Sequence, residues 1–96
     1  MRFSWSRAKN QVNIQKHGIS FELARYVFND PFHFTQKNRI ECGEQRYETV
    51  GEVEGTLLFV IHTMEEDEDG TIIAIRLISA RKADKSERRS FENERR

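Results

Sequence analysis

The fold is decided by one continuous stretch, residues 45–78, which reads QRYETVGEVEGTLLFVIHTMEEDEDGTIIAIRLI. It holds segments typical of β-strands at 45–53, 57–61 and 72–78. Glu54-Gly55 is a tight-turn signal between the first two segments, and the acidic run 65–70 separates the second from the third. Connections this short predict that successive strands pair antiparallel, because a parallel crossover needs a dozen or more residues.

The segments around this stretch predict a further strand at each end of a helical pair and a helix at the C-terminus. Ser6 and Ser20 offer N-cap hydroxyls, Gly18 suits the left-handed end of a helix, and Pro31 ends the next helix. Asp84, with a glutamate three residues later, has the spacing of a capping box. The expected elements are a strand over 3–5, helices over 6–17 and 20–30, a strand over 32–37 and a helix over 84–94.

The expected order is therefore β-α-α-β-β-β-β-α in a single domain over residues 1–96, since a chain this short forms one domain. This order predicts an α+β fold with two N-terminal helices, an antiparallel sheet of three to four strands and a C-terminal helix. The last helix has one large apolar side chain, Phe91. It is either a mobile solvated tail or a segment that another chain holds in place, and the sequence leaves both open.

Charge is distributed unevenly along the chain. Lys and Arg number 16, and so do Asp and Glu, which gives a net charge of zero and by itself argues against a nucleic-acid partner. However, residues 1–39 carry seven basic against two acidic groups, and residues 76–96 carry eight against four. Residues 40–75 carry one basic group against ten acidic ones. Both ends are therefore basic, and the middle is acidic.

The composition argues against several classes of function. No apolar run approaches the roughly 18 residues of a membrane span, so we expect no membrane partner. The single cysteine, Cys42, indicates a reducing compartment, and we expect the cytoplasm. His17, His33 and His62 stand at no metal-ligand spacing with it, so we expect neither a metal nor another cofactor. His62, inside an apolar strand, is typical of a core or edge histidine rather than of a catalyst.

One face of the first predicted helix gathers polar side chains. Lys9, Asn13, Lys16 and His17 stand at i, i+4, i+7 and i+8, which places them on the same side of a helix. Such a face suits contact with phosphate, and the imidazole at its end can transfer a proton. The alternative is an ordinary solvated face with cations near the C-terminal end of the helix dipole. Spacing alone leaves both open.

Arg76 interrupts the apolar run of the last predicted strand. A buried guanidinium is costly unless it is paired or faces a cleft. Arg76 therefore either forms a structural ion pair with a glutamate on a neighbouring strand, such as Glu48, or binds an anionic ligand. Arg46 has a similar position, with Glu44 two residues before it on the same face.

Two more cations, Arg81 and Lys82, follow at the junction between the strand and the last helix. Grouped with Arg76, they would form a cluster of positive charge beside the sheet. Arginines in such a cluster bind a phosphodiester and stabilise the extra negative charge of its pentacoordinate transition state. RNA supplies its own nucleophile, the 2′-hydroxyl, so no serine or cysteine nucleophile is required.

Three segments that span nearly the whole chain resemble the toxins of the BrnT family. They are Phe3-x-Trp5 with Lys9, Asn13 and Lys16-His17-Gly18-Ile19; Glu44-x-Arg46-Tyr47 with Gly51; and Ile75-Arg76-x-Ile78-Ser79-Ala80-Arg81-Lys82-Ala83. The most specific parts are the Lys-His-Gly-Ile turn and the Ile-Ser-Ala-Arg-Lys-Ala segment.

The resemblance implies a RelE-like fold and a ribonuclease that blocks translation. It also implies a BrnA-type antitoxin, a ribbon-helix-helix DNA-binding protein that neutralises the toxin and with it represses their operon. Operator DNA would then be reached only through the antitoxin. Because no metal ligands accompany the cations, the expected enzyme is a metal-independent endoribonuclease. The alternative is a degenerate toxin that binds antitoxin or nucleic acid without cleaving it.

Roles for particular residues follow from the resemblance and from the cation cluster. The expected catalytic residues are His17, Arg46, Arg76 and Arg81, and the expected RNA-binding residues are Lys9, Lys16 and Lys82. Arg88 and Phe91 in the last helix are expected to contact the antitoxin. In a RelE-like fold the two basic ends would converge on one side of the sheet, and the acidic middle would face elsewhere.

Overall fold

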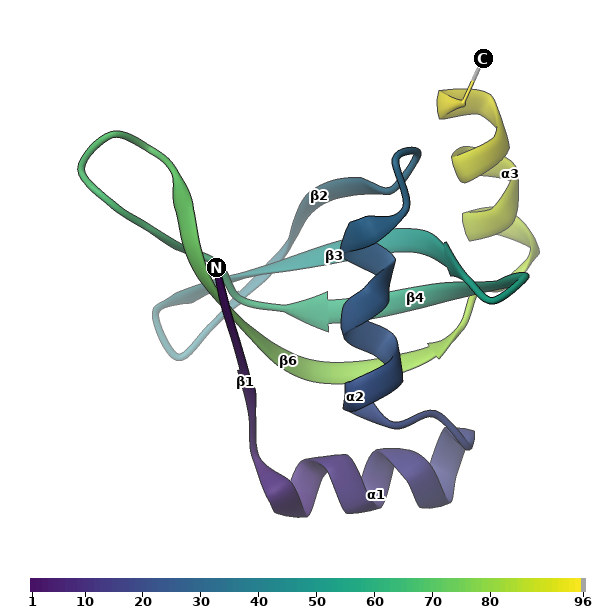
Figure 1. Cartoon of the computed structure of the whole chain (residues 1–96), viewed down its shortest axis with the longest axis horizontal. Coiled ribbons are helices and arrows are strands. Elements are labelled where there is room, and N and C mark those ends of the chain that lie inside the picture. Colours follow the sequence, from purple (N-terminus) through teal and green to yellow (C-terminus); the bar gives the residue numbers. More distant parts are fainter. Residues whose placement is uncertain (96) are drawn as a thin grey trace.

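The computed structural model describes residues 1–95, and within them the chain forms an α+β fold with a six-stranded mixed sheet and three α-helices (Figure 1). In chain order the elements are β1 (Arg2–Trp5), α1 (Arg7–His17), α2 (Phe21–Ala24), the 3-10 helix η1 (Arg25–Asn29), β2 (Phe34–Glu41), β3 (Glu44–Val53), β4 (Thr56–His62), β5 (Glu65–Glu66), β6 (Ile72–Lys82) and α3 (Lys85–Glu94). Among the described residues, no helix is long and apolar enough to cross a membrane.

The helices begin at the capping residues that the sequence indicates. The helix expected over 20–30, however, is an α-helix only as far as Ala24, and the 3-10 helix η1 follows it over Arg25–Asn29. The side chains of Ser6 and Ser20 each accept a hydrogen bond from a backbone N–H in the first turn of α1 and α2. Gly18 ends α1 with φ of 70°, in the left-handed region. Asp84 and Glu87 form the capping box that opens α3.

The strands lie in the order β1-β6-β4-β3-β2, and β5 pairs separately with β6. The pairs β2–β3, β3–β4 and β4–β6 are antiparallel, as the short connections predict. The sheet differs from the three to four antiparallel strands expected in two ways. It has more strands, since β5 also joins it, and it is mixed, because β1 runs parallel to β6. Short connections constrain only successive strands, whereas β1 and β6 are distant in the chain, which leaves their relative direction free.

Beyond the end of β1, the edge of β6 is completed by a side chain of α1. The amide nitrogen of Asn13 donates to the carbonyl oxygens of Ile19 and Ala80, both at 2.8 Å. Its amide oxygen accepts from the backbone N–H of Ala80 at 3.0 Å. Asn13 is only 5% exposed, so it pairs backbone groups that would otherwise be buried without partners. It thereby fixes α1 along β6.

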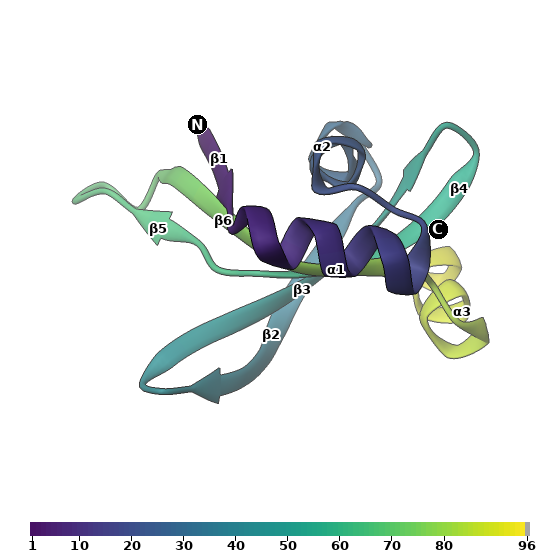
Figure 2. The same cartoon turned by 90° about the horizontal axis from the view of Figure 1, so that it is seen from below.

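Apolar side chains pack on both faces of the sheet. On one face, α2 and η1 bury Phe21, Ala24 and Val27 against β4 and β6. On the other face, Phe91 of α3 packs with a second cluster that includes Phe59, and Figure 2 shows α2 and α3 on opposite sides of the sheet. Phe91 is 3% exposed. The described part of α3 is therefore held by its own chain, which neither sequence-based alternative for this helix anticipated.

His62 lies in the core, as its place in an apolar strand predicts, and is fully buried. Its Nδ1 lies 3.1 Å from the carbonyl oxygen of Thr63, and its Nε2 lies 2.6 Å from the hydroxyl of Thr49. Because a carbonyl oxygen only accepts, Nδ1 carries the proton and Nε2 accepts from Thr49. The ring of Phe28 meets His62 edge-on with centroids 5.0 Å apart. Burial lowers the pKa of His62 from 6.5 to about 4.

The buried imidazole makes stability depend on pH. Between pH 6.5 and 4 the unfolded chain takes up a proton at His62, whereas the folded chain does not. The free energy of unfolding therefore falls as the pH is lowered through this window. The loss reaches about 3 kcal/mol near pH 4. We expect urea unfolding of His62→Gln to lack this component, whereas His17→Gln, at an exposed position, keeps it. Equal pH slopes for the wild type and His62→Gln would contradict the assignment.

Replacing Asn13 should destabilise the fold far more than its place on the polar face of a helix suggests. Asn13→Ala leaves three buried backbone groups unpaired, so we expect a loss of about 3 kcal/mol or more in the free energy of unfolding. Asn13→Asp should be at least as damaging, because a carboxylate would face two carbonyl oxygens. Gln15→Ala, exposed on the same helix, is the matched control. Chemical denaturation that ranks Asn13→Ala with this control would disprove the role.

Candidate functional site

The three arginines predicted to be catalytic lie on the same face of the sheet. His62, Leu77 and Ala80 point toward α2 and η1, on what we call the helix face. Side chains alternate between the two faces along each strand. The residues next to these three therefore point to the opposite side of the sheet, which we call the open face. The open face carries Arg46, Glu48, Val50, Phe59, Ile61, Arg76, Ser79 and Arg81.

Each of these arginines is held by a carboxylate. Arg76 pairs with Glu44, not with the Glu48 suggested by the sequence, and Arg46 pairs with a glutamate of β2 rather than with Glu44. The register of β2 on β3 causes this exchange, because it brings Glu41 opposite Glu44. The pairs are Arg46 Nη1 with Glu41 Oε2 at 3.1 Å, Arg76 Nη2 with Glu44 Oε1 at 2.7 Å and Arg81 Nη2 with Glu87 Oε2 at 2.8 Å.

Arg81 also has a structural contact with α3. Its two terminal nitrogens donate to the two carboxylate oxygens of Glu87, both at 2.8 Å, and its guanidinium lies 4.2 Å from the centroid of the Phe59 ring. The hydrogen bonds to Glu87 raise the pKa of Arg81, as do the charges of Asp84 and Glu48. Arg81 thus links β6 to the first turn of α3.

Arg46 is the most enclosed of the three arginines, with 19% of its side chain exposed. Its Nε is buried and has no hydrogen-bond partner among the described residues. An unpaired buried donor costs free energy, and an acceptor oxygen brought to this side chain would recover it.

A second cationic surface lies between α1 and β6. It is a groove of about 350 Å³ lined by Ala8, Lys9, Val12, Asn13, Lys16, His17, Ile78 and Ser79. Lys9, Lys16 and His17 are exposed, and within residues 1–95 no carboxylate forms an ion pair with them. The polar face predicted for this helix therefore divides: Asn13 supports the fold, and the other three face the groove.

Ser79 connects this groove to the open face. It lines the groove, and on the sheet it stands opposite Ile61, which stands opposite Glu48 on β3. The cations of α1 therefore border the surface that carries the arginines. Lys82 does not join them, since it pairs with Leu58 of the helix-face cluster and alternates away from Arg81.

The two residues expected to contact an antitoxin differ in access. Arg88 is exposed on α3, and Phe91 is buried against the sheet. Phe91 can meet a partner only if α3 moves away from its seat.

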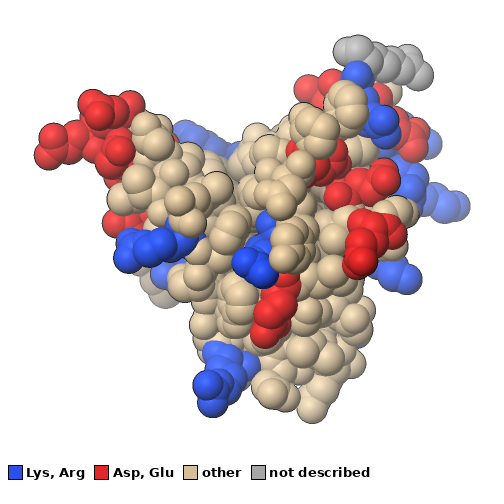
Figure 3. Space-filling model, in the orientation of Figure 1, with Lys and Arg blue, Asp and Glu red and all other residues tan. Residues whose placement is uncertain are grey.

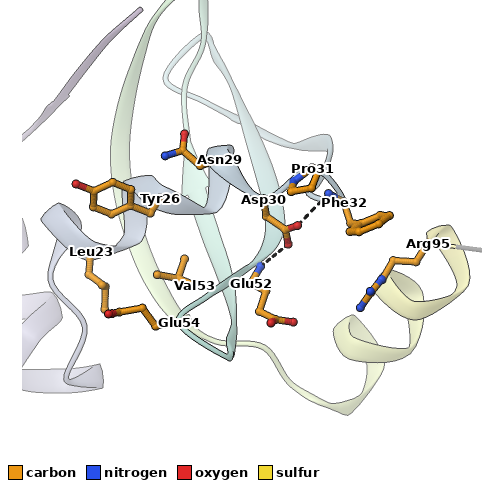
Figure 4. A pocket seen from close by; sticks show the side chains of 10 residues that line it. All are labelled: Leu23, Tyr26, Asn29, Asp30, Pro31, Phe32, Glu52, Val53, Glu54 and Arg95. Atoms are coloured by element: carbon orange, nitrogen blue, oxygen red, sulfur yellow. Dashed lines mark hydrogen bonds between the residues drawn. The ribbon is translucent and has the colours of Figure 1, made fainter.

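The sequence did not indicate a larger groove, of about 640 Å³, between η1, the β3–β4 turn and α3 (Figure 4). Tyr26 and Phe32 line it as exposed aromatic rings, and Arg95 lies 4.6 Å from the centroid of the Phe32 ring. Its other charged residues are Asp30, Glu52 and Glu54. Carboxylates repel phosphate, so this groove does not suit RNA. The only sequence signal was the pair of aromatic residues around Asp30-Pro31.

The sequence predicted that the acidic middle of the chain would face away from the cations, but only part of it does. Its acidic run, 65–69, lies on a hairpin that projects from the body of the protein and forms the red group at the left of Figure 3. Glu41, Glu44 and Glu48, however, share the open face with the arginines. The sequence could not anticipate this, because the side to which each glutamate points depends on strand register.

In the part of the chain that the structure describes, His, Cys, Asp and Glu side chains nowhere gather in a group of three that could hold a metal ion. The charged side chains that the open face and the α1 groove bring near one another are the arginines, Glu48, Lys9, Lys16 and His17.

Comparison with known proteins identifies the family of the chain. No curated protein matches the chain. The model of one family, described as the ribonuclease toxin BrnT of type II toxin-antitoxin systems, matches residues 5–87. This match covers most of the 96 residues. The chain therefore belongs to the BrnT family of ribonuclease toxins.

Proposed function

We propose that residues 1–96 form one BrnT-like toxin domain with a RelE-like fold that cleaves RNA internally and needs no metal ion. The observation that carries this proposal is the junction at Ser79 between two cationic surfaces. The α1 groove offers cations that bind no carboxylate among the described residues, and the open face offers arginines that already bind carboxylates. A carboxylate and a phosphate present similar oxygens to a guanidinium, so phosphate can exchange for glutamate.

In this proposal RNA first contacts Lys9 and Lys16, which form no ion pair within residues 1–95. The scissile phosphate then lies over the open face, where Arg46, Arg76 and Arg81 hold it and neutralise the charge that develops in the transition state. The 2′-hydroxyl attacks the phosphorus and the 5′-oxygen leaves, which yields a 2′,3′-cyclic phosphate. His17, at the end of the groove, is placed to exchange a proton with the reacting oxygens.

The wider role proposed here is that of a type II toxin. Cleavage of RNA would inhibit translation in the cytoplasm, and a BrnA-type ribbon-helix-helix antitoxin would neutralise the toxin and with it repress the operon. Arg88 is available for direct contact with the antitoxin. Contact through Phe91 would require the antitoxin to displace α3, because that ring is buried.

Substituting Arg76 should abolish toxicity without unfolding the protein. Its ion pair with Glu44 is half exposed and contributes little to stability, so Arg76→Ala should unfold as the wild type does. We expect cleavage of a mixed-sequence RNA to slow roughly 100-fold, as on loss of one transition-state donor. Growth arrest on induction should be relieved. Arg89→Ala, an exposed arginine of α3, is the control.

Two results would count against the enzyme. If Arg76→Ala cleaves RNA and arrests growth as the wild type does, the assignment of this arginine is wrong. If the purified wild type binds RNA but leaves it intact, the non-catalytic interaction module is the better description.

RNA binding should depend on salt through the lysines of the α1 groove. The logarithm of the binding constant falls linearly with the logarithm of salt concentration, and each lost phosphate contact reduces the slope by about one. Lys9→Gln with Lys16→Gln should therefore reduce the slope by about two. Lys37→Gln, an exposed lysine of β2, should leave it unchanged. Fluorescence anisotropy at several salt concentrations measures this, and an unchanged slope in the double variant would exclude the groove.

A further inference from the structure

Glu48 is held in the middle of the open face by two neutral amides. Gln36 donates to its Oε2 and Asn38 donates to its Oε1, both at 2.9 Å. Both amides come from β2, and Asn38 lies where the register of β2 on β3 shifts between Lys37 and Ile40. Such an irregularity redirects side chains, and here Asn38 reaches Glu48. Each carboxylate oxygen therefore has one fixed hydrogen bond and keeps lone-pair capacity for another.

This carboxylate differs from the others beside it. Glu41, Glu44 and Glu87 each bind an arginine, whereas Glu48 forms no ion pair within residues 1–95. An arginine that binds a carboxylate occupies its oxygens, and a substrate hydroxyl could reach them only by displacing that arginine. Glu48 is thus the carboxylate of the open face that a hydroxyl group can approach without breaking an ion pair.

Its place in the sheet is equally specific. A cross-strand row runs from Glu48 through Ile61 to Ser79, and the α1 groove with His17 begins beyond Ser79. Neighbouring strands are about 4.8 Å apart, so the backbones at the two ends of this row are separated by roughly 10 Å. This is room for one phosphodiester with a side chain on each side of it.

The neighbouring rows supply the positive charge. Arg81 lies one row to one side of Ser79 and Arg76 lies to the other side, both on the open face. Glu48 is close enough to Arg81 for its charge to act on that guanidinium. Ile61, between Glu48 and Ser79, gives the row an apolar floor.

We infer that Glu48 is the general base of the cleavage reaction, an inference that rests on the proposed ribonuclease function. The carboxylate takes the proton of the 2′-hydroxyl as the 2′-oxygen bonds to phosphorus. The bond from phosphorus to the 5′-oxygen breaks, and that oxygen takes a proton from His17. In-line displacement puts entering and leaving oxygens on opposite sides of phosphorus. Glu48 stands at one end of the row, and His17 lines the α1 groove together with Ser79, which stands at the other end. Exchange of protons with water restores both side chains.

The test compares Glu48→Gln with Glu52→Gln, which lies on the same strand and is exposed. Single-turnover cleavage of a short fluorescent oligoribonucleotide should slow about 100-fold or more in Glu48→Gln and remain unchanged in Glu52→Gln. Binding of the 2′-deoxy version of the oligonucleotide should be as tight or tighter in Glu48→Gln, because a negative charge is removed. The fall in rate on the acidic side of the wild-type pH profile should disappear in the same variant.

Outcomes distinguish this inference from the proposed function. If the wild type leaves RNA intact, both fail. If the wild type cleaves and Glu48→Gln cleaves equally fast, Glu48 is not the base and the ribonuclease function stands. If Glu48→Gln loses cleavage together with oligonucleotide binding and thermal stability, its role is structural and the inference is overturned. Glu48→Asp guards against that confusion, because it keeps the carboxylate and should retain more activity than Glu48→Gln.

Discussion

The arrangement of this protein depends on one amide side chain at the edge of a strand. β1 covers β6 only as far as Leu77, and three residues later the backbone of Ala80 would be left without partners. Asn13 supplies both the donor and the acceptor that a further strand would supply. A helix can therefore follow β1 along the same edge. Because α1 occupies this edge in place of a strand, its cations lie beside the open face.

Ion pairs on the open face orient its arginines, and in the proposed function they also prepare these arginines to bind phosphate. Three arginines on one face of a sheet would repel one another if none of them had a counter-ion. The glutamates of β2, β3 and α3 remove that repulsion and fix the direction of each guanidinium. Most of these pairs are partly exposed, so they cost little to exchange for another oxyanion. The arginines of the open face thus already bind carboxylates at the positions where the proposed function places a phosphate.

The sequence predicted the local elements better than the relations between distant ones. Caps at Ser6, Ser20 and Asp84 are local patterns, and the structure keeps them. The parallel pairing of β1 with β6 leaves no local pattern, since it depends on segments far apart in the chain. The partner of Arg76 depends on strand register and on the irregularity in β2, which no spacing reveals. For the same reason Glu48 looked like a structural ion-pair partner until its side-chain contacts were visible.

Glu87 belongs to two structures at once. One of its oxygens accepts from the backbone N–H of Asp84 in the capping box, and the same carboxylate binds both terminal nitrogens of Arg81. Anything that draws Arg81 away therefore weakens the start of α3, and anything that loosens α3 frees Arg81. Thermodynamic linkage makes this relation reciprocal. Binding of an anion by Arg81 and attachment of α3 to the sheet are therefore coupled through Glu87.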